Sequence, residues 1–246
     1  MHFLKRLSRF LACRTMRASV RMIVAPAAVK WAESLKKFPG SEKTGESGFS
    51  IANGSQEGFF SSLDKDTKRR TRFAKGQALL MDHPARDPIH LVNSLDWSGK
   101  DCPKTVIDIG GSHGRLMEAI LRNSPRFNRV WFKTCQGWWT ELLVILHDWP
   151  DADAIRILRN QISVLEVGDW IIFNEGVMEG VIEDKAFQDQ MQRCSDIMMH
   201  ELFNAKERSK DEWVAFFAAA DPRFKVESFI KSPSAVLSTI IVIWTG

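Results

Sequence analysis

The pattern of apolar and polar positions divides the chain into two regions that predict different elements. Between residues 30 and 100, amphipathic stretches alternate with polar loops, which predicts a series of helices. One helix is expected over residues 32–38, where Pro39 and Gly40 end it, and a longer one over about residues 60–81. This half of the chain therefore predicts a helical segment.

The second region, from residue 104, predicts an α/β fold with a sheet of mainly parallel strands. It opens with a short β-rich run that ends at Asp108, followed by three glycines and an amphipathic helix. The later elements expected are a strand at 141–146, a helix at 151–165, a strand at 170–173 and a terminal strand at 236–244. The terminal strand could lie antiparallel at an edge of the sheet. Strands that alternate with helices in this way are typical of parallel sheets covered by helices.

Composition and charge narrow the class of protein. The 246 residues are 44% apolar and 26% charged, which suits a globular protein, and no apolar run approaches the ~20 residues of a membrane span. Residues 1–32 contain basic side chains and no acid, a pattern shared by mitochondrial presequences, membrane-surface helices and ordinary terminal helices. We expect a cytoplasmic protein, with mitochondrial targeting as the alternative.

Two other kinds of partner are disfavoured by the sequence. The basic run "KRRTRFAK" lies close to Asp64 and Asp66 and predicts a solvated helix face, so no nucleic-acid partner is expected. The stretch "HELFN" resembles the start of a zinc-protease motif, but Asn204 occupies the position of the second histidine. The four cysteines are scattered and form no C-x-x-C pair. We therefore expect no metal site and a reducing compartment.

The glycines after Asp108 suit a nucleotide-like cofactor. Gly110, Gly111 and Gly114 at a strand-to-helix turn allow the backbone to approach such a ligand and direct helix N–H groups at it. A nicotinamide fingerprint needs a glycine where this chain has Ile109, which weakens a reductase, as does the absence of tyrosine from the chain. An acid before the glycines instead suits S-adenosylmethionine, whose sulfonium is positively charged.

Several segments together resemble one family, the S-adenosylmethionine-dependent O-methyltransferases of the plant caffeate type and their fungal secondary-metabolism relatives. The segments are "VIDIGGSHG", "ILHDWPDADAIRILRN", "MMHELFNAKERSKDEW" and, more loosely, "FSIANGSQEGFF" with "HLVNSLDW". They occur in the family's order and cover roughly residues 30–230. The resemblance implies a Rossmann-like methyltransferase sheet in a catalytic domain at 101–246, preceded by a helical segment at 1–100 that retains part of a dimerisation domain.

The same resemblance implies roles for individual residues. His147 corresponds to the general base that takes the proton from a substrate hydroxyl, and Glu175 and Glu207 correspond to the two carboxylates that bracket it. Asp108 and the three glycines would hold S-adenosylmethionine. Met198 and Asn204 resemble the family's substrate-facing segment, although helical spacing alone favours Met198 and Met199 as core residues.

Other residues around the histidine have structural interpretations. Asp148 and Pro150 suit the start of a helix, where the helix dipole stabilises acidic side chains. Ser209 and Glu212 have the spacing of a capping box, which predicts a helix that begins there.

The chain departs from the family at the expected second strand and at its N-terminus. A nucleotide-binding α/β fold places an acid about 20 residues beyond the glycines to bind the ribose, but that window here is "RVWFKTCQ" and contains none. Gly114 and His147 are also closer in sequence than their counterparts in the family, which predicts a sheet shortened at one edge. The first 100 residues hold at most the last part of the dimerisation domain, so a homodimer is not the favoured state.

These observations lead to two hypotheses of different classes. The first is an O-methyltransferase that transfers a methyl group from S-adenosylmethionine to a hydroxyl of an aromatic small molecule, in polyketide-type secondary metabolism. The second is a catalytically inactive methyltransferase-like protein with a binding or scaffold role, or a truncated gene product. His147 with its two glutamates favours the first, and the missing ribose acid favours the second.

Overall fold

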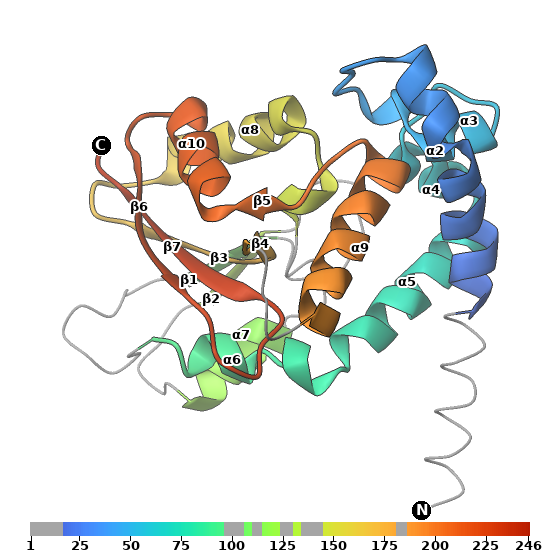
Figure 1. Cartoon of the computed structure of the whole chain (residues 1–246). Coiled ribbons are helices and arrows are strands. Elements are labelled where there is room, and N and C mark those ends of the chain that lie inside the picture. The colour runs from blue at the N-terminus through green and yellow to red at the C-terminus, as the bar shows by residue number, and fades with distance from the viewer. Residues whose placement is uncertain (1–16, 96–105, 110–114, 124–129, 134–144, 181–185) are drawn as a thin grey trace, which may run out of the picture. The chain divides into compact units, whose positions relative to one another are not determined.

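A computed structural model describes residues 17–95, 106–109, 115–123, 130–133, 145–180 and 186–246 (Figure 1). The chain divides into two compact units. The first unit comprises Met1–Met81, His147–Ala152 and Glu179–Glu207, and the second comprises Asp82–Leu146, Asp153–Met178 and Arg208–Gly246. The domain boundary that we predicted near residue 100 stays a prediction.

The first unit is helical. Its helices are α2 (Ala25–Lys37), α3 (Gly48–Ala52), α4 (Phe59–Lys65), α5 (Thr67–Met81) and α9 (Ala186–Phe203), with a π-helical turn at Val20–Val24 and a 3-10 turn at Thr44–Glu46. Helix α2 ends just before Pro39 and Gly40, as predicted. The single helix predicted over residues 60–81 is wrong, because the chain leaves the helical conformation at Asp66, whose carboxylate accepts the amide of Arg69 at 2.9 Å and starts α5.

The core of the first unit is built on aromatic rings. Phe59, almost fully buried, lies edge-on to Phe49 at 4.9 Å, Phe73 at 4.9 Å and Phe203 at 5.1 Å between ring centroids. Phe203 is the last residue of α9, so these contacts fix the end of that helix against α3, α4 and α5. Figure 1 shows α9 beside the N-terminal helices, far from them in sequence.

The second unit contains a three-stranded antiparallel sheet. It has the order β3 (Trp170–Glu175), β7 (Ser238–Trp244) and β6 (Phe224–Ile230). The predicted strands at 170–173 and 236–244 are confirmed, and the terminal strand is antiparallel. The edge position considered for it is wrong, because β7 lies between β3 and β6 and is buried along nearly its whole length. A strand that is covered on both faces has an uninterrupted apolar sequence.

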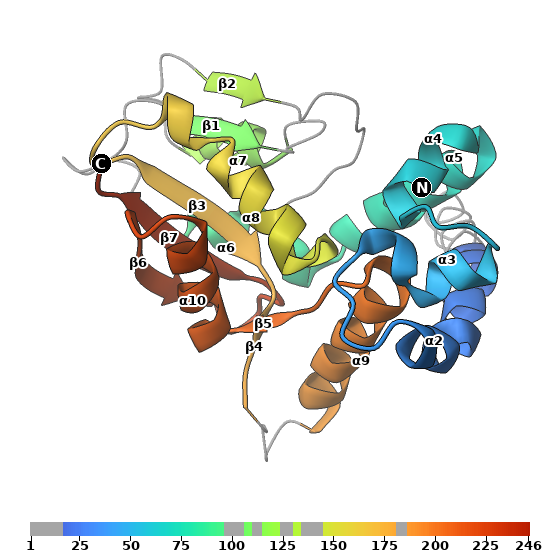
Figure 2. The same cartoon turned by 90° about the horizontal axis from the view of Figure 1, so that it is seen from above.

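Helices cover both faces of this sheet, which confirms an α/β fold (Figure 2). Phe173 packs on Phe217 of α10 (Lys210–Ala220), with ring centroids 5.0 Å apart. Its neighbour Ile172 packs on the opposite side, against buried residues of α6 (Ile89–Val92) and α7 (Arg115–Asn123). Successive residues of a strand point to opposite faces, so this pair marks the two helical layers.

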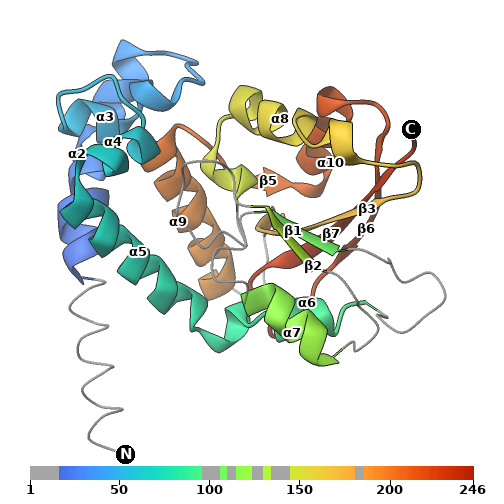
Figure 3. The same ribbon diagram turned by 180° about the vertical axis from the view of Figure 1, so that it is seen from behind.

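The remaining strands form two short parallel pairs. Strand β1 (Val106–Ile109) pairs with β2 (Val130–Lys133), and α7 lies between them in sequence, which makes a β–α–β unit (Figure 3). Strand β4 (Val177–Met178) pairs with β5 (Arg208–Ser209). A 3-10 turn spans Pro84–Arg86. None of the described helices combines the length and the hydropathy that crossing a membrane requires.

Two predicted elements near His147 differ from the structure. Of the strand predicted at 141–146, only the last two residues are described, and Leu146–Asp148 forms a 3-10 turn instead. The helix predicted at 151–165 is α8 (Asp151–Arg159), followed by a separate 3-10 turn at Ile162–Val164.

Candidate functional site

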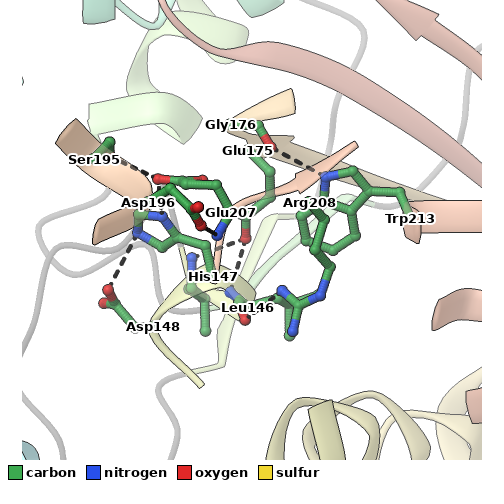
Figure 4. Close-up of polar contacts among 11 residues, drawn as sticks. Leu146, His147, Asp148, Glu175, Gly176, Ser195, Asp196, Glu207, Arg208 and Trp213 are labelled. Atoms are coloured by element: carbon green, nitrogen blue, oxygen red, sulfur yellow. Dashed lines mark hydrogen bonds and ion pairs between the residues drawn. The ribbon is translucent and has the colours of Figure 1, made fainter. Parts of the chain in front are cut away.

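His147 lies in the 3-10 turn that precedes α8, with both ring nitrogens next to carboxylates (Figure 4). Its Nδ1 lies 2.9 Å from Oε1 of Glu207, and its Nε2 lies 3.2 Å from Oδ1 of Asp148. The imidazole side chain is 13% exposed, and both carboxylates are more deeply buried. The structure thus brings together His147 and Glu207, which are 60 residues apart in sequence and which the sequence predicted as partners.

These contacts decide the charge of the ring. Burial lowers the pKa of the His147 imidazole, but the charges of Asp148 and Glu207 and their hydrogen bonds outweigh burial and hold that pKa well above the ordinary 6.5. Burial raises the pKa of the Asp148 carboxyl, an effect that the adjacent imidazole opposes. A protonated imidazole between two carboxylates is therefore the favoured state near neutral pH.

Helix α9 supplies the groups that hold Glu207. The Ser195 hydroxyl donates to Oε1 of Glu207 at 2.7 Å, and the Asp196 carboxylate accepts the backbone amide of Glu207 at 2.9 Å. Lys206 forms an ion pair with Asp151 at 3.1 Å beside this group. The carboxylate that faces His147 is thus fixed through both its side chain and its backbone.

Asp148 has a different role from the one that the sequence predicted. We expected it to start a helix, but α8 begins at Asp151, and the Asp148 carboxylate contacts His147 instead. Its Oδ2 is buried and has no hydrogen-bond partner among the described residues. The sequence signal was its position directly after the histidine in "HDW", which a helix-start interpretation set aside.

Glu175, the third predicted catalytic residue, ends strand β3 and contacts the backbone that leads to the histidine. Its Oε1 accepts the amides of Ile145 at 3.0 Å and Leu146 at 2.8 Å, and the side chain is almost fully buried. The predicted role of Glu175 as a carboxylate on the ring stays a prediction. In the structure it holds the peptide groups just before His147.

Arg208 completes this arrangement, and sequence reasoning missed it. Its side chain is 1% exposed, and Nη1 donates to the carbonyl of Leu146 at 3.0 Å. The guanidinium stacks over the rings of Trp213 and Phe216, 4.9 and 4.8 Å from their centroids. Leu146 is thus held at its amide by Glu175 and at its carbonyl by Arg208 (Figure 4). The signal was the arginine of "KER", of which only the glutamate was assigned.

The two predicted substrate residues lie at and near the end of α9. Asn204 follows the helix with φ of 57°, a left-handed conformation that asparagine tolerates, and its side-chain amide donates to the carbonyls of Ser41 at 2.7 Å and Lys43 at 3.1 Å. Met199 is a core residue, whereas Met198 is half-buried. The structure gives Asn204 a capping role, and the substrate contacts of Met198 and Asn204 stay predictions.

The predicted cofactor residues lie mostly outside the described residues. This holds for Gly110, Gly111, Gly114 and the side chain of Asp108. Strand β1 ends at Ile109 and helix α7 begins at Arg115, so the glycines join a strand to a helix, the context that a nucleotide-like ligand requires.

The ribose position fits less well. It follows the second strand of the β–α–β unit, and β2 ends at Lys133 in a stretch without an acid. The part that the glycines play in holding S-adenosylmethionine therefore stays a prediction, and the sequence that follows β2 does not supply the usual ribose acid.

Two other stretches that the sequence singled out lie on α9 and at the start of α10. His200 accepts the indole N–H of Trp31 at its Nδ1, 3.0 Å away, and no group of three potential metal ligands occurs among the described residues. The capping box is confirmed, because the hydroxyl of Ser209 accepts the amide of Glu212 and the Glu212 carboxylate accepts the amide of Ser209. That box starts α10.

Comparison with known proteins gives consistent matches in sequence. No protein-family model matches the chain. The O-methyltransferase kk1A of Curvularia clavata is 30% identical over 249 residues, which cover 89% of this chain and 58% of that protein. Another fungal relative, the O-methyltransferase PaMT of Phomopsis amygdali, is 25% identical over 88% of this chain. The chain spans about three fifths of the length of these curated relatives.

Comparison with solved structures shows the fold. The mitomycin 7-O-methyltransferase MmcR matches with a TM-score of 0.68 and 20% identity over 89% of this chain and 68% of that one. LepI, solved in complex with S-adenosylmethionine, matches with a TM-score of 0.70 and 15% identity over 95% of this chain and 67% of that one. A structure described as a pericyclic reaction enzyme has the same TM-score and 16% identity, covering 95% and 68%.

The fold and the sequence matches agree with the motifs around His147. The relatives named above are fungal, so they support the fungal branch of the predicted family and not specifically the plant caffeate-type branch. Over most of its length, the chain is similar in sequence to these fungal O-methyltransferases.

Proposed function

We propose that the protein transfers a methyl group from S-adenosylmethionine to a hydroxyl of an aromatic small molecule, with His147 as the general base. The observation that carries the proposal is the partly buried His147 ring, with Nδ1 2.9 Å from Glu207. A carboxylate at Nδ1 keeps a proton there in the neutral ring, so that Nε2 carries the basic lone pair. The names of the fungal relatives support the reaction class, and the LepI complex supports the cofactor.

The chain's own residues would manage the proton. His147 takes the hydroxyl proton at Nε2, while the electron pair of the acceptor oxygen forms the new bond to carbon. Asp108 and the glycines would hold S-adenosylmethionine, which would supply the electrophilic methyl group and leave as S-adenosylhomocysteine, with the electron pair of the broken C–S bond on sulfur. Glu207 stabilises the imidazolium that results. When no methyl acceptor is bound, Asp148 can accept a hydrogen bond from the Nε2–H of the protonated ring.

A second candidate is a methyltransferase-like protein that binds a metabolite without transferring a methyl group. This candidate is favoured by the sequence at the end of β2. The strand ends at Lys133, and the stretch around it contains no acid that could bind the ribose. One structural neighbour is described as a pericyclic reaction enzyme, so the fold alone does not define the reaction. The first proposal includes a cytoplasmic location and a polyketide-type substrate. It includes neither a nucleic-acid partner nor a homodimer.

Calorimetric titration of the full chain with S-adenosylmethionine and S-adenosylhomocysteine tests the proposal directly. We expect saturable binding of both ligands, together with methylated product by mass spectrometry when phenolic acceptors are supplied. Binding without product from any acceptor would favour the second candidate. No binding at millimolar ligand would contradict both the cofactor and the reaction, since a Kd near 1 mM corresponds to only about 4 kcal/mol of binding free energy.

The pH dependence of methyl transfer should reflect the two carboxylates on the ring. A general base works only when deprotonated, and Asp148 and Glu207 hold the pKa of His147 well above 6.5. Transfer should therefore be slow at pH 6.5 and rise as the pH increases through the raised pKa. Measurement of kcat/KM with a phenolic acceptor between about pH 6 and pH 10 shows this limb. A plateau that is already reached at pH 6.5 would contradict the protonated resting state.

A further inference from the structure

We propose that Ser195 is a positioning residue of this site, which acts through Glu207 and sets the proton affinity of His147. The inference rests on the proposed function for its meaning in catalysis, although its physical content concerns the side chains alone. The juxtaposition that carries it is a single oxygen: Oε1 of Glu207 lies 2.9 Å from His147 Nδ1 and accepts the Ser195 hydroxyl at 2.7 Å.

Helix α9 is suited to this role because it holds Glu207 at two points. Ser195 and Asp196 are consecutive residues, and they contact the side chain and the backbone amide of Glu207 respectively. The left-handed turn at Asn204 directs the chain back along the helix, and the amide of Ala205 donates to the carbonyl of Met199. A residue 12 positions after Ser195 therefore lies beside it. One helix thus sets the place of the carboxylate.

The shared oxygen couples the hydroxyl to the imidazole. A hydroxyl that donates to a carboxylate stabilises the negative charge, so that the carboxylate attracts a neighbouring proton less strongly. Without this donor, Oε1 would stabilise the imidazolium more. Ser195 therefore keeps the proton affinity of His147 below the value that the two carboxylates would otherwise impose.

Among the described residues, three carboxylates lie in the contacts that surround the ring. Asp148 faces Nε2, Glu207 faces Nδ1, and Asp196 of α9 faces the amide of Glu207. The ion pair between Lys206 and Asp151 lies on the segments that flank the site. Ser195→Ala removes only a hydroxyl and leaves the charge of each of these groups unchanged, so a shift in the proton affinity of His147 would report on that hydroxyl.

The test is an NMR titration of the histidine rings in the full-length chain, with the His147 signal assigned by its loss in His147→Gln. We expect Ser195→Ala to raise the pKa of His147 by about half a unit, and Ser195→Thr, which keeps a hydroxyl, to restore it. The control is Cys194→Ala, which truncates an exposed neighbour on the same helix and should leave the pKa unchanged. An unchanged or lowered pKa in folded Ser195→Ala would overturn the proposal.

The titration needs neither cofactor nor substrate, so its result is independent of the proposed function. If methyl transfer is observed, the acid limb of the Ser195→Ala profile should move to higher pH by the same half unit, about threefold in rate at a pH below the limb. A uniform loss of rate at every pH, without a displaced limb, would assign a merely structural role and would also overturn the proposal. If Ser195→Ala fails to fold, Ser195→Cys, a weak donor of similar size, replaces it and should raise the pKa in the same direction.

Discussion

Replacement of His147 by glutamine is expected to lower kcat for methyl transfer by roughly a hundred- to ten-thousand-fold, the usual contribution of a positioned general base. Glutamine has a similar reach and can donate to Glu207 in place of Nδ1, but it accepts no proton near neutral pH. The contact between His147 and Glu207 is 2.9 Å long and partly buried in the parent chain, and the glutamine amide gives the carboxylate a donor in its place. The measurement is single-turnover methyl transfer at saturating cofactor.

The matched control for this variant is His83→Gln. His83 is exposed and caps the 3-10 turn at Pro84–Arg86, outside the site, so its replacement should leave kcat unchanged. S-adenosylmethionine affinity, measured by calorimetry, should be the same for both variants within twofold, since neither belongs to the glycine corner. Loss of cofactor affinity in His147→Gln, or a rate close to that of the parent chain, would contradict the assignment of His147 as base.

The sequence predicted the partners at His147 better than it predicted the backbone that carries them. His147 and Glu207 were paired through "HDW" and "KER", and the structure places them in contact. Instead of continuing the strand expected before the histidine, Leu146 begins a 3-10 turn. Glu175 binds its amide and Arg208 binds its carbonyl, so these groups are not free to pair with another strand. Hydrogen bonds to side chains so distant in sequence leave no periodic signal.

The sheet shows a similar limit. The apolar run of β7 was recognised as a strand, yet its central position depends on β3 and β6 lying on either side of it. Burial on both faces leaves a continuous apolar sequence, whereas a half-exposed strand alternates, so the unbroken apolar run at 240–244 is a signal for a central strand that the prediction did not use. The break at Asp66 was harder to foresee, because a single capping contact to Arg69 separates two helices of compatible pattern.

Replacement of Arg208 by alanine is expected to lower the free energy of unfolding by about 3–5 kcal/mol. The substitution removes a side chain that is 1% exposed, leaves a cavity against Trp213 and Phe216, and takes the donor from the carbonyl of Leu146. Arg208→Met fills most of that volume and contacts the rings but donates no hydrogen bond, so its loss should be smaller. Urea unfolding, compared at equal slope, gives both values.

Arg223 provides the control because it makes the same type of ring contact at the surface. Its guanidinium lies 4.4 Å from the Trp244 ring centroid and pairs with Asp221, but its side chain is 46% exposed. Arg223→Ala should therefore cost a small fraction of what Arg208→Ala costs, because water replaces the lost contacts. Equal losses from the two variants would show that stacking alone, and not burial with the bond to Leu146, accounts for the stability that Arg208 contributes. A large loss for Arg208→Ala with a small one for Arg223→Ala would mean that burial and the bond to the carbonyl of Leu146, the residue before His147, account for most of the stability that Arg208 contributes.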